Sequence, residues 1–244
     1  MMFLKGDFHL HTADDRHDYI QHTAEELIDH AARKGFKLLS ITNHDTFTFH
    51  KDLYNYALDR GILLIPGIEK KIENKHVLLL NAFPACEKIK TFEELRRAKS
   101  DGLFVIAPHP FFKTLHCLED QLIEHIELFD AIEYSFFYSK WFNFNKKAVA
   151  VACDYDLPLV GNSDCHLLKY FGLCHSLIYA EQLNELAVFE AIRAKKIKVI
   201  SEPIFLPKLV VIFMDMVTHK YRVKYKIRKK SLLTVKRTEE DVYL

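Results

Sequence analysis

The chain has 244 residues, of which 49% are hydrophobic and 27% charged, and its formal net charge is +1. This is the composition of a folded globular protein, and the global charge indicates no particular partner. Five cysteines without a C-x-x-C pair argue against a disulfide framework and against a thiolate zinc site, and they favour a reducing, cytoplasmic location. The longest apolar stretch, 206–217, is interrupted by Pro207, Lys208 and Asp215, so we expect no membrane span.

Helix and strand patterns alternate along the chain. Thr23 and Glu26 have the spacing of a capping box, and the helix that begins there is expected to end at Gly35. Further helices are predicted over residues 51–59, 91–100, 117–128, 140–155 and 183–195. Apolar runs predict an opening strand and strands over residues 37–42, 62–65, 76–83, 103–107, 131–134, 157–161 and 198–201. This alternation predicts an α/β protein with a mainly parallel sheet.

The opening strand carries a pair of histidines, His9 and His11, two residues apart. On an extended segment this spacing places both imidazoles on the same face, where they can hold one metal ion. His17 follows six residues later, beyond a short polar run that reads as a loop. Alone, such a pair is as readily explained by polar surface as by metal binding, so its interpretation depends on the rest of the chain.

Other polar clusters also follow apolar, strand-like runs. These clusters are His44 after residues 37–42, Glu69 after residues 62–65, His109 after residues 103–107, and Asp164 with His166 after residues 157–161. In a barrel of parallel strands the carboxyl ends all lie on one face, where active sites are built. The pattern therefore predicts that these side chains converge on one pocket.

Five short motifs in this order resemble those of the PHP family of metal-dependent phosphoesterases. They are DFHLHT (residues 7–12), ITNHDT (41–46), PGIE (66–69), APHP (107–110) and GNSDCH (161–166). Each motif is weak evidence alone, but the ordered set is specific, and it covers about residues 1–201. The resemblance implies a distorted (β/α)7 TIM-like barrel with two or three metal ions at the carboxyl ends of the strands. We expect residues 1–206 to form this domain and residues 207–244 to be a basic extension packed on the barrel.

The same resemblance implies a set of metal ligands in this sequence. They are His9, His11, His17, His44, Glu69, His76, His109, Asp164 and His166. His17 is preferred over its neighbour Asp18, and catalytic roles are assigned to His17, Glu69 and Asp164. Asn43 stands where the family usually has an aspartate, which is expected to weaken support of a ligand.

The chemistry of these side chains limits the choice of metal. Imidazole and carboxylate ligands suit Zn²⁺, Mn²⁺ or Fe²⁺. Two such ions, about 3.5–4 Å apart, can share a hydroxide that attacks a phosphate at neutral pH. Asp7, two residues before His9, is a candidate to fix the tautomer of a ligand histidine through a hydrogen bond.

Fewer residues indicate how a substrate would be held. Arg16 and Lys140 are predicted to bind the phosphate, although each is also explained as a solvated surface charge. The aromatic run 134–144 could form a wall for a base or a sugar, but packing of the following helix explains it more readily. Residues 208–244 carry ten Lys or Arg against four Asp or Glu. Within them, the alternation over 220–228 predicts a strand with a basic outer face, better explained as a protected sheet edge than as a nucleic-acid contact.

The sequence thus predicts a cytoplasmic metal-dependent phosphoric ester hydrolase. We expect it to act on a small phosphorylated metabolite or nucleotide through a metal-bridging hydroxide. One alternative is a nuclease or phosphodiesterase for short oligonucleotides, and another is a non-catalytic PHP module stabilised by metal. Neither a membrane nor a nucleic acid is favoured as a partner.

Overall fold

The computed structural model describes residues 2–218, and the chain divides into two units, Met1–Ile204 and Phe205–Leu244. In the second unit residues 206–218 are helical. The strand predicted over 220–228 lies outside the described residues. The predicted boundary after residue 206, and the packing of the extension, stay predictions. Over the part that is described, no helix is both long and apolar enough to cross a membrane.

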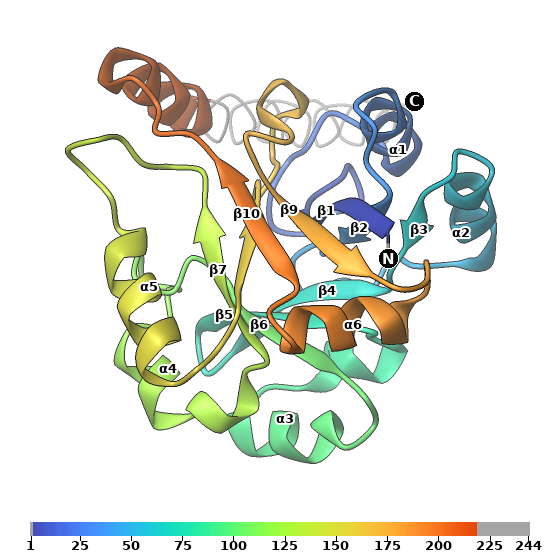
Figure 1. The fold of residues 1–244 in the computed structure, drawn as a ribbon, viewed down its shortest axis with the longest axis horizontal. Helices are drawn as coiled ribbons and strands as arrows, with labels where there is room; N and C mark the ends of the chain where they lie inside the picture. The colour runs from blue at the N-terminus through green and yellow to red at the C-terminus, as the bar shows by residue number, and fades with distance from the viewer. Residues whose placement is uncertain (1, 219–244) are drawn as a thin grey trace, which may run out of the picture. The chain divides into compact units, whose positions relative to one another are not determined.

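The strands of the first unit form two mixed five-stranded sheets (Figure 1). The first sheet has the order β10-β9-β1-β2-β3 and consists of β1 (Met2–Leu10), β2 (Leu38–Ile41), β3 (Leu63–Leu64), β9 (Cys174–Ala180) and β10 (Ile197–Ser201). The second has the order β4-β5-β6-β7-β8 and consists of β4 (Gly67–Ile72), β5 (Lys75–Leu80), β6 (Phe104–Ala107), β7 (Ala131–Ser135) and β8 (Leu159–Asn162).

The α/β class is confirmed, but the hydrogen-bonded ladders among residues 2–218 do not form the predicted closed barrel. Pairing is parallel for β1-β2-β3 and for β6-β7-β8, and antiparallel for β10-β9-β1 and for β4-β5-β6. The antiparallel pairs interrupt the strand-helix alternation that a closed parallel barrel needs. Isolated parallel bridges still connect the two sheets: Leu10 at the end of β1 pairs with Cys165 after β8, and His44 after β2 pairs with Glu69 in β4.

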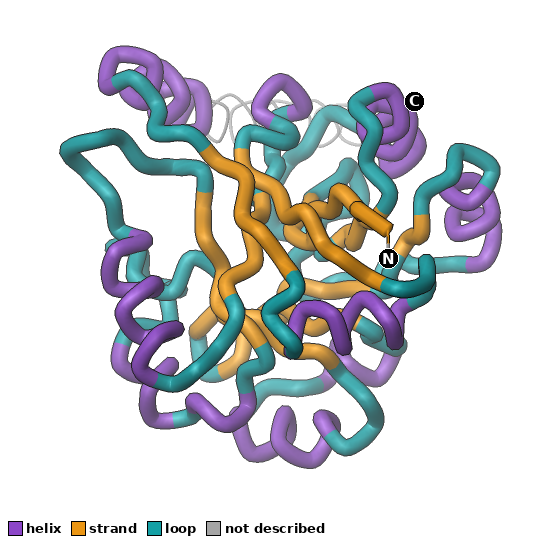
Figure 2. The backbone as a smooth tube through the Cα atoms, viewed as in Figure 1, coloured by secondary structure: helices purple, strands orange, loops and turns teal. Residues whose placement is uncertain are grey.

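Helices surround the strands of the first unit (Figure 2). They are α1 (Ala24–Arg33), α2 (Lys51–Leu58), α3 (Phe92–Lys99), α4 (Asp120–Glu124), α5 (Asn145–Asp154) and α6 (Glu185–Arg193), with short 3-10 turns at Pro84–Lys88, Ile126–Leu128 and Leu168–Tyr170. Thr23 and Thr91 each accept a hydrogen bond in a complete capping box, so the signals that predicted α1 and α3 are confirmed. The helix predicted over 140–155 begins later, at Asn145, because residues 136–144 form a loop, and the one predicted over 117–128 is divided into α4 and the 3-10 turn Ile126–Leu128.

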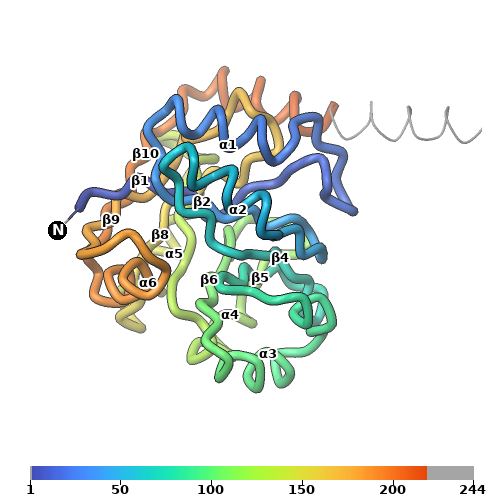
Figure 3. Tube along the Cα trace, turned by 90° about the vertical axis from the view of Figure 1, so that its right-hand side faces the viewer, coloured from blue at the N-terminus to red at the C-terminus, as the bar shows by residue number. Residues whose placement is uncertain are grey.

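Three apolar clusters hold these layers together. Helices α1 and α2 pack on β2, and α3 and α4 pack on the side of β5 and β6 (Figure 3). The third cluster contains Phe8 and Leu38 from the first sheet, Leu78 and Phe104 from the second, and Phe189 from α6. Because its residues come from both sheets, this shared core fixes the sheets, and therefore the ends of their strands, relative to one another.

One glycine permits a close approach beside the motif that carries Glu69. A Cβ atom on Gly67 would lie 2.1 Å from Ser40 Oγ and 2.8 Å from Thr42 Cγ2. Only a residue without a side chain lets β4 begin this close to β2. The PGIE motif thus brings Glu69 to the end of β2, where His44 follows.

Candidate metal centre

Side chains of the metal-binding type converge at the ends of β1, β2, β6 and β8, where they meet β4 and β5. They form four groups, and the potential ligand atoms of each group lie within 4.8 Å of one another. The groups are His9, His11 and Asp164; His9, Glu69 and His109; His44, Glu69 and His76; and His11, His44 and His166. Every predicted ligand except His17 is therefore brought into one connected cluster.

Glu69 lies between two of these groups. Its Oε2 atom is 3.2 Å from His9 Nε2 and 3.0 Å from His44 Nε2. Its Oε1 atom is 2.8 Å from His76 Nδ1 and 3.5 Å from His109 Nε2. Glu69 thus has one oxygen beside His9 and His44 and the other beside His76 and His109.

The buried atoms at this centre have the wrong geometry for hydrogen bonds to one another. Both oxygens of Glu69 and the Nε2 atoms of His9 and His11 are buried without a hydrogen-bond partner among the described residues. Buried polar atoms are normally paired, and lone-pair donors that face one another need an electrophile between them. The donor set, imidazole nitrogen with carboxylate oxygen, fits a divalent transition metal.

Asp164 and His166 close the cluster from the loop after β8. Asp164 Oδ1 lies 3.3 Å from His9 Nε2, from His11 Nε2 and from His166 Nδ1. Asp164 has a φ of 45° and His109 a φ of 30°. These are backbone conformations that non-glycine residues rarely adopt, and strain of this kind concentrates at functional sites.

A buried glutamate, Glu133 on β7, accepts hydrogen bonds from the ring of one ligand histidine and from the backbone of another. Its Oε2 atom accepts a hydrogen bond from His9 Nδ1 at 2.8 Å, and its Oε1 atom accepts one from His109 N at 3.2 Å. Asn162 Nδ2 also donates to Oε2 at 3.1 Å. Because the Nδ1 proton of His9 is held by Glu133, the Nε2 lone pair of His9 is directed at the cluster.

Asp15 accepts hydrogen bonds from the rings of two other histidines. Its Oδ2 atom accepts hydrogen bonds from His11 Nδ1 at 3.0 Å, from His44 Nδ1 at 2.8 Å and from His44 N at 2.8 Å. Sequence reasoning missed both carboxylates. Glu133 was signalled by a charged residue inside an apolar strand, and Asp15 by its position four residues after His11.

Two other expectations about the surroundings are revised by the structure. Asp7 Oδ1 accepts from the backbone N–H groups of His9 and Ser163, at 3.3 and 3.2 Å, so it shapes the strand end and orients no ring. Asn43 Oδ1 accepts from Thr12 N at 2.8 Å, and Asn43 Nδ2 donates to Thr12 Oγ1 at 2.9 Å. Asn43 therefore joins the loops that follow β1 and β2, and the support that it was expected to weaken comes from Asp15.

The remaining predicted site residues lie outside the four groups. His17 is half exposed, and its Nε2 atom lies 3.1 Å from Asp45 Oδ2, whereas Asp18 Oδ2 lies 3.3 Å from His166 Nε2. Arg16 and Lys140 are exposed. Lys70, the residue after Glu69, is buried, and it pairs with Asp45.

Charge is concentrated at this centre. Burial alone raises the pKa of a carboxyl group, but His44, His9 and His76 outweigh it and hold the pKa of Glu69 well below its usual value. Burial likewise lowers the pKa of an imidazole, but Glu69 and Asp15 outweigh it and raise the pKa of His44 to about 10. Both shifts have one cause, the attraction between these buried carboxylates and the protonated imidazoles packed against them.

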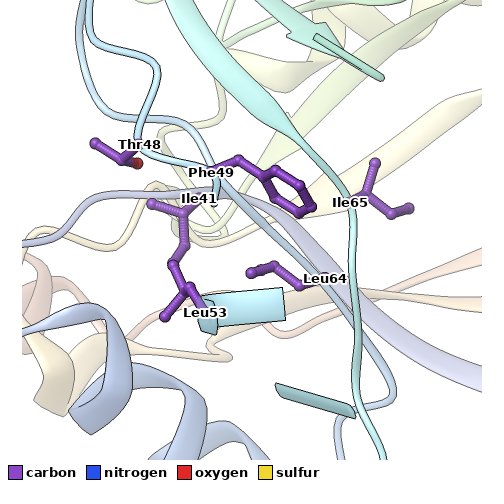
Figure 4. Close-up of a pocket in the computed structure, with 6 residues that line it drawn as sticks. All are labelled: Ile41, Thr48, Phe49, Leu53, Leu64 and Ile65. Carbon is purple, nitrogen blue, oxygen red and sulfur yellow. The ribbon is translucent and has the colours of Figure 1, made fainter. Parts of the chain in front are cut away.

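A separate small pocket lies beside β2 and β3 (Figure 4). Its lining side chains are Ile41, Thr48, Phe49, Leu53, Leu64 and Ile65. None of these side chains titrates or binds metals in the ordinary pH range, so this pocket is not a candidate for chemistry.

Comparison with known proteins places these motifs in context. The family model described as PHP-associated matches residues 142–197. Comparison with the sequences of curated proteins gave no significant match. Among solved structures, the chain resembles a two-domain protein from Bacteroides vulgatus that contains a predicted PHP-like metal-dependent phosphoesterase, with a TM-score of 0.64 and 19% identity over 82% of this chain and 65% of that one.

Two further structures share the fold. PsfC from Pseudomonas syringae has a TM-score of 0.64 and 18% identity over 91% of this chain and 99% of that one. The lesion-specific endonuclease Q from Pyrococcus furiosus has a TM-score of 0.60 and 16% identity over 81% of this chain and 58% of that one. The chain thus spans less than two thirds of the endonuclease and of the Bacteroides protein. The PHP-associated match agrees with the resemblance that the ordered motifs carry, and these solved structures, 16–19% identical to the chain, show that the fold is shared.

Proposed function

We propose that the chain is a metal-dependent phosphoesterase whose active site is the cluster around Glu69. The observation that carries the proposal is the set of buried, unpartnered donor atoms of Glu69, His9 and His11 that face one another. Structural hydrogen bonding would have paired these atoms. A surface histidine cluster, in turn, would be solvated rather than buried.

The ligands fall into positions for up to three ions. The proposed sets are those of the four groups: Asp164 with His9 and His11, Glu69 with His9 and His109 or with His44 and His76, and His166 with His11 and His44. Divalent ions held there would supply an activated water at neutral pH and positive charge for the phosphoryl oxygens in the transition state.

The chain's own residues orient the reacting groups. Glu133 and Asp15 keep the Nδ1 protons on His9, His11 and His44, so that these rings present lone pairs and not protons to the centre. His17 is outside the four groups, is half exposed and is held at Nε2 by Asp45. We assign it the role of proton donor to the leaving oxygen, because its ring lies 6.1 Å from that of His44 and belongs to no ligand group.

The test combines metal content with hydrolysis. Protein purified without chelators is analysed for bound metals and assayed against p-nitrophenyl phosphate and bis(p-nitrophenyl) phosphate with Mn²⁺ or Zn²⁺ added. We expect at least two ions per chain and hydrolysis that a chelator abolishes. His9→Gln should lose both, whereas His125→Gln, whose ring stacks on Phe92 away from the cluster, should keep both. Bound metal without hydrolysis would instead support the non-catalytic module.

A second candidate is a nuclease. Endonuclease Q shares the fold, and it has also been solved in complex with a 27-mer duplex that carries an abasic lesion at the active site. Preference for the diester over the monoester, and cleavage of a short oligonucleotide, would favour this reading over a phosphatase of small metabolites.

A further inference from the structure

The only tryptophan of the chain, Trp141, is exposed to solvent. It lies in the loop 136–144 between β7 and α5, with 69% of its surface accessible, and its neighbour Phe142 is 59% accessible. Other aromatic side chains of the same run, Phe136 and Tyr138, are buried. The aromatic run 134–144 therefore contains both buried and exposed rings. Core packing, the explanation favoured from the sequence, accounts only for the buried ones. Exposed neighbouring aromatic side chains of this size mark a binding surface more often than a structural one.

The exposure of these two rings is built by the backbone of the turn. Ser139 is almost fully buried, and its N–H donates to Phe142 O at 2.7 Å. Its hydroxyl oxygen accepts from Trp141 N at 3.3 Å and from Phe142 N at 3.0 Å. These three hydrogen bonds close a compact turn around Ser139. The rings of Trp141 and Phe142 are therefore presented to solvent by an ordered turn.

The turn belongs to the end of the sheet that carries the metal centre. Strand β7 runs parallel to β6 and β8, so the loop that follows it leaves at the same end as His109 and Asp164 (Figure 1). Phe112 connects the two regions. Its ring centroid is 6.5 Å from that of His109 and 5.3 Å from that of Phe144, two residues beyond Phe142. Aromatic surface therefore extends from His109 to the loop that presents Trp141.

We propose that Trp141 and Phe142 form a stacking platform for an unpaired nucleobase of a single-stranded oligonucleotide whose scissile phosphate lies at the metal centre. Stacking on aromatic side chains is how proteins hold unpaired bases, and it tolerates any base because each has a π-face. Lys140, exposed and without an ion-pair partner in residues 2–218, adds a positive charge for a neighbouring phosphate. This inference rests on the proposed function and specifies its substrate class as single-stranded nucleic acid.

Trp141 provides its own probe, because tryptophan fluorescence of this protein reports on this residue alone. The wild-type full chain, freed of metal by chelator so that no cleavage occurs, is titrated with pentathymidylate and with an oligomer of the same length that consists of abasic deoxyribose phosphates. We expect saturable quenching by pentathymidylate and no more than weak, salt-sensitive quenching by the abasic oligomer. Equal quenching by both oligomers, or none by either, would overturn the proposal.

Variants separate stacking from general binding. With metal restored, Trp141→Ala should raise the KM for pentathymidylate about tenfold with kcat little changed, and Trp141→Phe should recover most of the loss. Leu186→Ala, which removes an exposed apolar side chain from α6, is the matched control and should leave KM unchanged. Unchanged KM in Trp141→Ala would refute the platform.

Two other results would differ from the expected one, and each has its own meaning. If the metal-loaded protein hydrolyses no phosphate ester while base-dependent quenching persists, the proposed function fails and the platform stands. If the fluorescence instead depends on protein concentration, and light scattering shows self-association that Trp141→Ala abolishes, the turn is an interface between two copies and the platform is refuted.

Discussion

Substitution of Glu133 by glutamine tests how much the hydrogen bonds of this carboxylate contribute to metal binding. Glu133 is fully buried and accepts three hydrogen bonds, from His9 Nδ1, Asn162 Nδ2 and His109 N. A glutamine side chain of the same shape has one oxygen and one NH2 group. If its oxygen replaces Oε2, the NH2 group faces the N–H of His109, and if it replaces Oε1, the NH2 group faces His9 Nδ1 and the amide of Asn162. In either orientation, the glutamine NH2 group faces another hydrogen-bond donor.

The expected effect is a loss of metal affinity rather than of fold. Removal of an outer hydrogen-bond partner of a metal-bound histidine typically weakens metal binding by about 10- to 100-fold. At about 1.4 kcal/mol for each factor of ten, this corresponds to about 1.4–2.8 kcal/mol. That figure matches the loss of one hydrogen bond to a charged acceptor, about 1.5–3 kcal/mol. Because the ligands themselves remain, added metal should restore much of the hydrolysis.

The assay is a competition titration against a chelator of known affinity, followed by kcat/KM at limiting and at saturating Mn²⁺. Glu190→Gln, the same change at an exposed position of α6, serves as the control. Metal affinity of Glu133→Gln within about twofold of the wild type, with circular dichroism unchanged, would show that the paired hydrogen bonds of the Glu133 carboxylate to His9 and His109 do not set metal affinity. The assignment of His9 as a ligand through Nε2 would then lose its main support.

Three more outcomes follow from other contacts. Asp15→Asn removes the shared acceptor of His11 Nδ1 and His44 Nδ1, and should weaken metal binding at least as much as Glu133→Gln, read by the same titration. Gly161→Ala places a Cβ atom 2.7 Å from His175 O, a backbone atom that cannot move aside cheaply, and should lower the free energy of unfolding in urea by about 1–3 kcal/mol. In metal-free protein the raised pKa of His44, about 10, contributes stability that is fully present below about pH 6.5 and is lost as pH rises toward 10. The stability difference between the wild type and His44→Gln should therefore shrink over that range, and a constant difference would contradict the shift.

Local signals in the sequence predicted the elements that local physics determines. The capping box at Thr23 and the N-cap residue Thr91 predicted where α1 and α3 begin, because a cap is satisfied within four residues of chain. Two strands went unpredicted. One is β4, Gly67–Ile72, which pairs antiparallel with β5. The other is β9, Cys174–Ala180, whose buried and partly buried residues alternate. It pairs antiparallel with β1 and β10, and such pairing across the chain is set by tertiary packing that no local pattern specifies.

The candidate ligands were predictable for a related reason. Each follows or lies within a strand, and strand ends converge wherever the strands share a sheet edge. Seven of the eight positions could therefore be grouped from the motifs, and His76 was added from the family resemblance. The choice between His17 and Asp18 depended on the path of one loop, and the structure places Asp18 rather than His17 beside His166. Loop paths depend on contacts such as Asp15 to His44, which join residues far apart in sequence.

The carboxylates at this centre show why the fold must hold the ligands in place before a metal binds. Glu69, Asp164, Asp15 and Glu133 bring four carboxylates to one place, and burial of unpaired negative charge is costly. The surrounding apolar clusters, which include side chains from both sheets and from the helices, stabilise the strands whether or not a cation is bound. Metal binding then offsets the repulsion among groups that the fold already holds in place, so chelation should lower the thermal midpoint without abolishing the fold. Complete unfolding on chelation would mean that the metal, and not the shared core of the two sheets, holds the strand ends together.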